Sequence, residues 1–162
     1  MSDTPTMLHM MCGKIASGKS TLARQLAKAE ATVLLVEDDW LSALYPDELT
    51  SGADYLRCSA RLRTVMAPHV AALIGAGVSV VLDFPANTPD QRGWMRDAVR
   101  ATGARHRLHL LEASDALCLA RLKARNAGDD HPFAVTEARF HRFTRHFTPP
   151  TPEEGFEVAL HP

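Results

Sequence analysis

The fold is decided by residues 13–20, which read Gly13-Lys14-Ile15-Ala16-Ser17-Gly18-Lys19-Ser20. This stretch matches G-x-x-x-x-G-K-[ST] at every fixed position, between an apolar segment (7–12) and an amphipathic one (19–29). Such a loop turns backbone N–H groups toward phosphate oxygens, and the helix that follows adds its positive dipole end. An accidental glycine-rich turn would not need these flanks. We therefore expect residues 13–20 together with Thr21 to bind nucleotide phosphates, with Lys19 at the β- and γ-phosphates and Ser20 at Mg²⁺.

Apolar segments alternate with helical ones along the rest of the chain. We expect strands at 7–12, 32–36, 78–82, 106–111 and 156–160, and helices at 19–29, 55–74, 89–101, 114–125 and 136–146. Strands spaced by helices predict an α/β fold with a parallel sheet covered on both faces, and ligands bind beyond the carboxyl ends of such strands. Pro68 is expected to kink or divide the helix 55–74, and Ser114 to cap the helix that it begins.

Length and charge limit the possible functions. The 162 residues, 46% hydrophobic and 23% charged, predict one globular domain over 1–162 and exclude a disordered or collagen-like chain. The net charge of -1 provides no overall field to attract nucleic acid or an anionic membrane. Positive charge is nevertheless uneven, since residues 92–145 hold eleven Arg or Lys against six acids. Fourteen of the eighteen basic residues are Arg, which favours forked recognition of phosphate.

The cysteines and the N-terminus bear on the compartment. Three cysteines without metal-ligand spacing predict free, buried thiols in a reducing environment. Residues 1–12 lack the pattern of a signal peptide, and no apolar stretch is long enough for a membrane helix. We therefore expect a cytoplasmic protein without membrane contact. The eight histidines show no ligand spacing, so we assign no metal beyond nucleotide-bound Mg²⁺.

Carboxylates follow two of the expected strands. Asp83 ends an apolar strand and is expected to hold Mg²⁺ together with Ser20, the alternative being a turn or helix-cap residue. Glu37, Asp38 and Asp39 follow the strand 32–36. One of them is expected to accept the proton of an acceptor hydroxyl, while others occupy the first turn of a helix. The residues alone leave Asp38 and Asp39 as alternatives for the base.

Arginines provide the expected cations. Arg121 and Arg125 are four residues apart on one helix face and are expected to close over the phosphates as part of a lid near 121–135. A favourable interaction with the helix dipole is the alternative. We expect five further arginines at the surface, with contact to acceptor or phosphate as the alternative: Arg57, Arg61, Arg63, Arg92 and Arg96.

In this order, the motifs resemble those of small P-loop kinases, the bacterial relatives of polynucleotide 5′-kinase, chloramphenicol phosphotransferase and zeta toxin, whose members are often labelled AAA-family ATPases. The resemblance is carried by the phosphate loop, Glu37-Asp38-Asp39-Trp40, Val81-Leu82-Asp83 with Asn87 and Arg92, Arg121 with Arg125-Asn126, His131-Pro132-Phe133, and Pro149-Pro150-Thr151-Pro152-Glu153-Glu154-Gly155-Phe156. It implies a three-layer P-loop NTPase fold of the kinase type, with a five-stranded parallel sheet of order 2-3-1-4-5. It also implies transfer of the ATP γ-phosphoryl group to a hydroxyl, with Asp38 as the general base. Val36, where relatives often carry Ser or Thr, and Phe84-Pro85 depart from the family pattern.

We expect an ATP- and Mg²⁺-dependent phosphotransferase that acts on an unidentified small molecule. Three alternatives remain: a polynucleotide 5′-hydroxyl kinase, which the near-neutral charge disfavours, a nucleoside or nucleotide kinase, and a switch that binds or hydrolyses ATP without an acceptor. The acceptor, the choice between ATP and GTP, and the oligomeric state stay open at this point.

Overall fold

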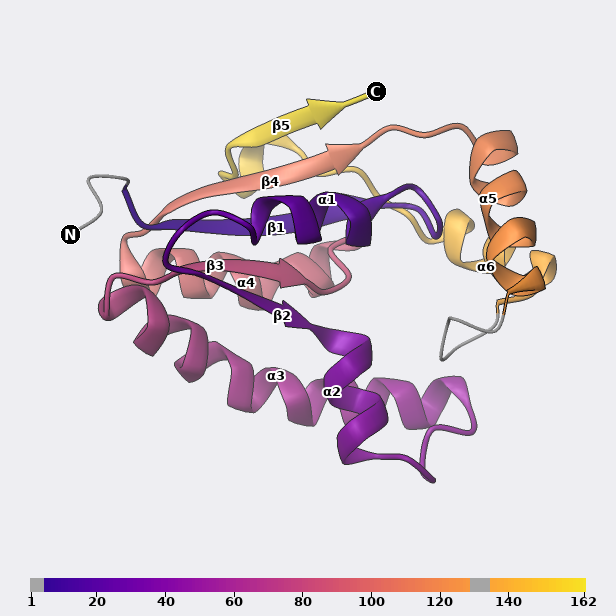
Figure 1. Cartoon of the computed structure of the whole chain (residues 1–162), viewed down its shortest axis with the longest axis horizontal. Coiled ribbons are helices and arrows are strands. Elements are labelled where there is room, and N and C mark those ends of the chain that lie inside the picture. The colour runs from indigo at the N-terminus through magenta and orange to yellow at the C-terminus, as the bar shows by residue number, and fades with distance from the viewer. Residues whose placement is uncertain (1–4, 129–134) are drawn as a thin grey trace.

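A parallel sheet organises the molecule. The computed structural model describes residues 5–128 and 135–162. Its strands are β1 (Met7–Gly13), β2 (Thr32–Val36), β3 (Ser79–Asp83), β4 (Arg105–Leu111) and β5 (Val158–His161). All neighbours pair in parallel in the order β2-β3-β1-β4-β5, which confirms the order that the family resemblance implies. The carboxyl ends of the strands therefore lie along the same edge (Figure 1).

Helices cover both faces of the sheet. They are α1 (Lys19–Leu26), α2 (Glu37–Leu44), α3 (Gly52–Gly75), α4 (Pro89–Thr102), α5 (Asp115–Ala127) and α6 (Glu137–Arg145), with a 3₁₀ turn η1 (Pro152–Glu154) before β5. In Figure 1, α1 crosses in front of the sheet and α4 behind it, while α5 and α6 lie beyond the carboxyl ends of the strands. Within the described ranges, no helix combines the length and the apolar character needed to cross a membrane.

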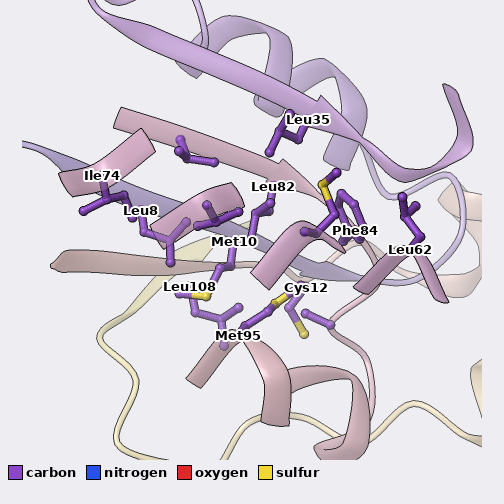
Figure 2. Packing of buried hydrophobic residues seen from close by; sticks show 14 of the residues in the cluster. Leu8, Met10, Cys12, Leu35, Leu62, Ile74, Leu82, Phe84, Met95 and Leu108 are labelled. Carbon is purple, nitrogen blue, oxygen red and sulfur yellow. The ribbon is translucent and has the colours of Figure 1, made fainter. Parts of the chain in front are cut away.

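Alternating strand residues build a core on each face. Leu8, Met10 and Cys12 of β1 are fully buried in the larger cluster, which the side chains of α3 and α4 complete. Figure 2 shows them close to Leu82 of β3 and Met95 of α4. On the opposite face Met11 packs with Ala23 of α1. Burial on both sides explains why these strands are continuously apolar in sequence. The three cysteines are buried and free, as the sequence predicts.

Of two helix features predicted from the sequence, one is confirmed and the other differs in the structure. Ser114 accepts a hydrogen bond from the Leu117 N–H, so the predicted cap of α5 is confirmed. Pro68 does not divide α3, which runs unbroken from residue 52 to 75. Pro68 is exposed, so its ring lies on the solvent side of the helix. The buried face, which includes Leu62, Met66 and Val70, holds the helix together despite the one missing N–H.

Three histidines form a hydrogen-bonded row across β1, β4 and β5. The His9 Nδ1 lies 3.0 Å from the His109 Nε2, and the His109 Nδ1 lies 2.9 Å from the His161 Nε2. Their positions 9, 109 and 161 show no pattern in sequence, and only the strand order brings them together. Burial, followed by the charges of His9, His161 and Arg107, lowers the pKa of His109 to about 4. Burial also lowers the pKa of His9, so His9 and His109 favour the neutral form.

This row makes the stability of the protein depend on pH. In the unfolded chain His109 takes up a proton near its ordinary pKa of 6.5, whereas the folded chain resists protonation until about pH 4. Stability from this group is thus complete above 6.5 and falls as the pH drops, by about 2 kcal/mol at pH 5. Urea unfolding at pH 7 and pH 5 should show that His109→Phe loses this part of the pH dependence. Substitution of the exposed His141 by Gln should leave the dependence unchanged, and equal pH dependence in wild type and His109→Phe would contradict this interpretation.

Candidate functional site

The loop between β1 and α1 has the backbone conformation of a tight cradle. Ala16 and Gly18 have positive φ values of 61° and 103°, in the left-handed region that glycine adopts without strain. The Ser17 N–H donates to the Lys14 carbonyl oxygen at 3.2 Å, which closes a turn inside the loop. A Cβ at Gly13 would lie 2.6 Å from the Ser17 Oγ and 3.3 Å from the Leu111 carbonyl oxygen, so a larger residue there would force its neighbours to move. Gly13 and Gly18, two fixed positions of the motif, thus contribute to the shape of the loop.

Lys19 holds a cation at the centre of this loop. Its Nζ donates to the carbonyl oxygens of Gly13 and Lys14 at 2.6 and 2.7 Å. Burial lowers the pKa of Lys19 to about 8, although the Asp83 carboxylate partly offsets this effect. An ammonium destabilised by its surroundings gains stability when an anion approaches. The loop therefore presents backbone amides, a helix N-terminus and a lysine suited to phosphate oxygens.

Ser20 and Asp83 meet beside the loop. The Ser20 hydroxyl donates to the Asp83 Oδ2 at 2.8 Å, which joins the first turn of α1 to the end of β3. Two oxygens this close fit a shared Mg²⁺, which prefers oxygen ligands and usually takes only one or two from protein. Among the described residues, no group of three or more His, Cys, Asp or Glu side chains is arranged to hold a metal. The pair would therefore bind the ion together with phosphate oxygens.

The three consecutive acids take different positions at the start of α2. Glu37 is buried, Asp38 is half-buried and Asp39 is exposed. The Asp38 charge raises the pKa of Arg125 on α5. Asp39 instead lines a shallow hollow of about 310 Å³ with Trp40, Ala43 and Leu44. Asp38 therefore acts on the charge of an arginine that itself lies within electrostatic reach of Lys19.

Helix α5 is attached to the outside of the loop. The Arg121 Nη1 donates to the Ser17 carbonyl oxygen at 3.1 Å, and Lys14 pairs with Asp115 at 2.6 Å. Arg125 lies within electrostatic reach of Lys19, and burial lowers its pKa while Asp38 raises it. Both arginines expected in a lid thus lie near the loop. Residues 129–134 of the expected lid 121–135 lie outside the described residues.

Asn87 is a site residue whose role the sequence does not indicate. Its Oδ1 accepts a hydrogen bond from the Gly13 N–H at 2.9 Å, at the point where β1 enters the phosphate loop. Its own backbone N–H donates to Gln91 at 2.9 Å, and its carbonyl oxygen accepts from the Thr148 N–H at 2.8 Å. Asn87 therefore links the loop to α4 and to the segment before β5. Its spacing from Asp83 in the family motif is the only sequence signal for this role.

The expectation that Arg92 lies on the surface is wrong. Its side chain is 1% exposed. The guanidinium pairs with Glu154 through Nε at 2.8 Å and donates through Nη1 to the carbonyl oxygens of Ala86 and Thr148 at 2.9 and 2.8 Å. An early helix position usually faces solvent, but here η1 folds over it and supplies the carboxylate. Arg92 thereby fixes the segment that carries Asn87.

Removal of this guanidinium should unfold the protein more readily. Arg92→Met would leave Glu154 and two carbonyl oxygens without their donor, and we expect the free energy of unfolding to fall by about 3 kcal/mol or more. Arg100→Met, in the exposed last turn of the same helix, is the matched control and should change it by less than about 0.5 kcal/mol. Urea unfolding of both variants makes the comparison. Similar stability of the two variants would show that the network around Arg92 is unimportant.

Comparison with known proteins gives a family and a fold. Residues 8–150 match the model of a family described as AAA domain. No curated protein matches the sequence. A kinase candidate from Chloroflexus aurantiacus has a similar structure, with a TM-score of 0.74 at 20% identity over 99% of this chain and 86% of that one.

Two further solved structures are kinases by description. A sugar kinase from Janibacter sp. HTCC2649 has a TM-score of 0.65 at 15% identity, covering 97% of this chain and 85% of that one. The APS kinase of Mycobacterium tuberculosis, solved in complex with AMPPNP and APS, has a TM-score of 0.58 at 21% identity, covering 96% and 88%. At these identities the likeness shows the fold, which is that of P-loop kinases.

Proposed function

The chain belongs to the AAA domain family, because the family model covers residues 8–150, and from this premise we propose that it is an ATP-dependent phosphotransferase with a small-molecule hydroxyl acceptor. One observation carries the proposal: the Lys19 cradle, the Ser20–Asp83 pair and the Asp38–Arg125 neighbourhood adjoin one another at the carboxyl edge of the sheet. Phosphoryl transfer needs these three elements together, a phosphate cradle, an ion site and a carboxylate near cations.

The donor side of the reaction follows from the loop. Backbone N–H groups of residues 13–21 and the α1 N-terminus would hold the ATP phosphates, with the Lys19 ammonium at the transferring group. Ser20 and Asp83 would hold Mg²⁺, which when bound neutralises charge on the β- and γ-phosphate oxygens. Arg121 and Arg125 would add positive charge from α5, on the side of the loop opposite the sheet. AMPPNP in the similar APS kinase supports a nucleotide in this fold.

The acceptor side is assigned to Asp38. In the proposed step a hydroxyl oxygen of the acceptor forms a bond to the γ-phosphorus while the bond to the β,γ-bridging oxygen breaks, which releases ADP. Asp38 orients that hydroxyl and takes its proton. The negative charge that builds up on the transferring group is stabilised by Lys19, Arg121 and Arg125. Each side chain has one task, and none has to serve both donor and acceptor.

A small acceptor suits the charge of the chain better than a polynucleotide. The net charge is -1, and α2, which is assigned to the acceptor side of the site, begins with three acids. Phosphate-backbone binding normally relies on several Lys or Arg side chains. Labelled ATP offered with an oligonucleotide bearing a 5′-hydroxyl would reveal a polynucleotide kinase directly.

The base assignment can be tested with adjacent variants. Mg-ATP is incubated with a panel of hydroxyl-bearing metabolites and antibiotics, and phosphorylated products are detected by mass spectrometry. Asp38→Asn should lower transfer by roughly 10²-fold or more while nucleotide affinity is kept. Asp39→Asn, one residue further on the exposed side of α2, should retain activity. If no member of the panel is phosphorylated, or if Asp38→Asn transfers as fast as wild type, the proposal is wrong.

Nucleotide affinity should depend on pH through Lys19. Because the pKa of Lys19 is about 8 and bound phosphate favours the ammonium, affinity should fall as pH rises above 8, by up to about tenfold per pH unit, with proton uptake on binding. Lys19→Arg stays charged in this range and should bind with little pH dependence. Calorimetry with Mg-ADP between pH 7 and 9.5, in buffers of different ionisation enthalpy, measures both effects. The same slope in wild type and Lys19→Arg would exclude Lys19 as its source.

A further inference from the structure

Glu37 is a buried carboxyl for which the proposed reaction has no use. It is the first residue of α2, directly after β2, and is only 2% exposed. The Tyr55 hydroxyl of α3 donates a hydrogen bond to its Oε1. Its Oε2 is also buried and has no hydrogen-bond partner among the described residues. A carboxyl in this position is costly, because a buried polar atom without a partner destabilises the fold by about 1–3 kcal/mol.

Charged groups surround Glu37 from three elements. Burial raises its pKa to about 7, the Tyr55 hydrogen bond and Arg63 of α3 lower it, and Asp38 of α2 and Asp83 of β3 raise it. Arg63 forms no direct ion pair with Glu37 in the described structure, and its Nε is buried without a partner. Among the described residues no cation forms an ion pair with Glu37. Where the carboxyl is ionised, its charge can therefore act on Asp38.

The effect of Glu37 on Asp38 is reciprocal. Because the Asp38 charge makes Glu37 harder to ionise, an ionised Glu37 makes Asp38 hold a proton more tightly. A carboxylate with greater proton affinity is a stronger base for a hydroxyl proton. The short distance along the chain and the low dielectric around Glu37 both strengthen this coupling.

We propose that Glu37 is a positioning residue for Asp38: the Tyr55 hydroxyl anchors the first turn of α2 to α3, and the buried Glu37 carboxyl is held next to Asp38 in that turn. The inference rests on the proposed function only in giving Asp38 the role of base. The Tyr55–Glu37 contact ties together the two elements that border the acceptor side. Glu37 itself contacts no reacting atom.

Two variants separate the charge from the anchor. Glu37→Gln keeps an oxygen for the Tyr55 hydroxyl but removes the charge. Tyr55→Phe keeps the carboxyl but removes the hydrogen bond that favours its ionised form, so Glu37 should then stay protonated at pH 7 and ionise at higher pH. Carboxyl ¹³C NMR follows Asp38 in protein labelled at aspartate, with the signal assigned from Asp38→Asn. Asp39→Asn is the control.

We expect the pKa of Asp38 to fall in Glu37→Gln relative to wild type, and to fall clearly less in Asp39→Asn, because water and salt screen the exposed Asp39 charge. In Tyr55→Phe the chemical shift of Asp38 should match that of Glu37→Gln at pH 7 and return toward wild type by pH 9. A purely structural role of Glu37 would not produce this recovery with pH. An Asp38 titration that is identical in wild type and Glu37→Gln would overturn the proposal, without any acceptor being required.

Kinetics provide the second readout once an acceptor from the panel is phosphorylated. Glu37→Gln should lower kcat by roughly tenfold and change KM for ATP by less than about twofold, since the phosphate loop is untouched. Tyr55→Phe should recover kcat between pH 7 and 9, and Glu37→Gln should not. If Glu37→Gln instead raised KM for ATP by about tenfold, Glu37 would contribute to the structure of the phosphate loop and not act through Asp38. If Asp38 titrates as expected but no acceptor is phosphorylated, the proposed function fails and the coupling between Glu37 and Asp38 stands.

Discussion

Parallel strand pairing is the constraint on which the site depends. The register pairs Val36 with Asp83 across β2 and β3, while β1 lies between β3 and β4 and runs directly into the phosphate loop. Each strand can therefore deliver one polar group to the same edge: the loop from β1, the acids of α2 from β2 and Asp83 from β3. An insertion of one residue in any of these strands would reverse which face its side chains meet. The positions of these polar groups are thus fixed by the main-chain hydrogen bonds of the sheet.

Polar groups buried around this edge give the site its character. Glu37 and Arg92 are buried and held by side chains from distant parts of the chain, and the Lys19 ammonium is held by two carbonyl oxygens of its own loop. Arg92 has its charge fully paired and stabilises the framework. The pKa values of Lys19 and Glu37 lie close to neutral pH, at about 8 and about 7. Groups of this kind respond to a bound anion or a neighbouring charge, which is what phosphoryl transfer requires.

The sequence predicts the strands and the phosphate loop, because these depend on local patterns of apolar residues and glycine. The order of the strands in the sheet is predicted only through the family resemblance. It does not predict the environment of Arg92 or the histidine row, since both depend on contacts between residues 52 to 100 positions apart. Local rules predict that Pro68 kinks or divides α3, but the packing of the buried face keeps the helix unbroken. The choice between Asp38 and Asp39 is of the same type. Adjacent residues differ in exposure only once α2 is packed in the fold, where it contacts α3.

The proposed reaction requires a nucleotide bound in the loop with its γ-phosphate toward Asp38. A crystal structure with Mg²⁺ and AMPPNP tests this claim most directly. We expect the triphosphate in the cradle of residues 13–21, the Lys19 ammonium on its β- and γ-oxygens, and Mg²⁺ about 2.1 Å from the Ser20 hydroxyl, with Asp83 coordinating directly or through water. The γ-phosphate should face Asp38. A nucleotide bound elsewhere, or one whose γ-phosphate points away from α2, would contradict the account.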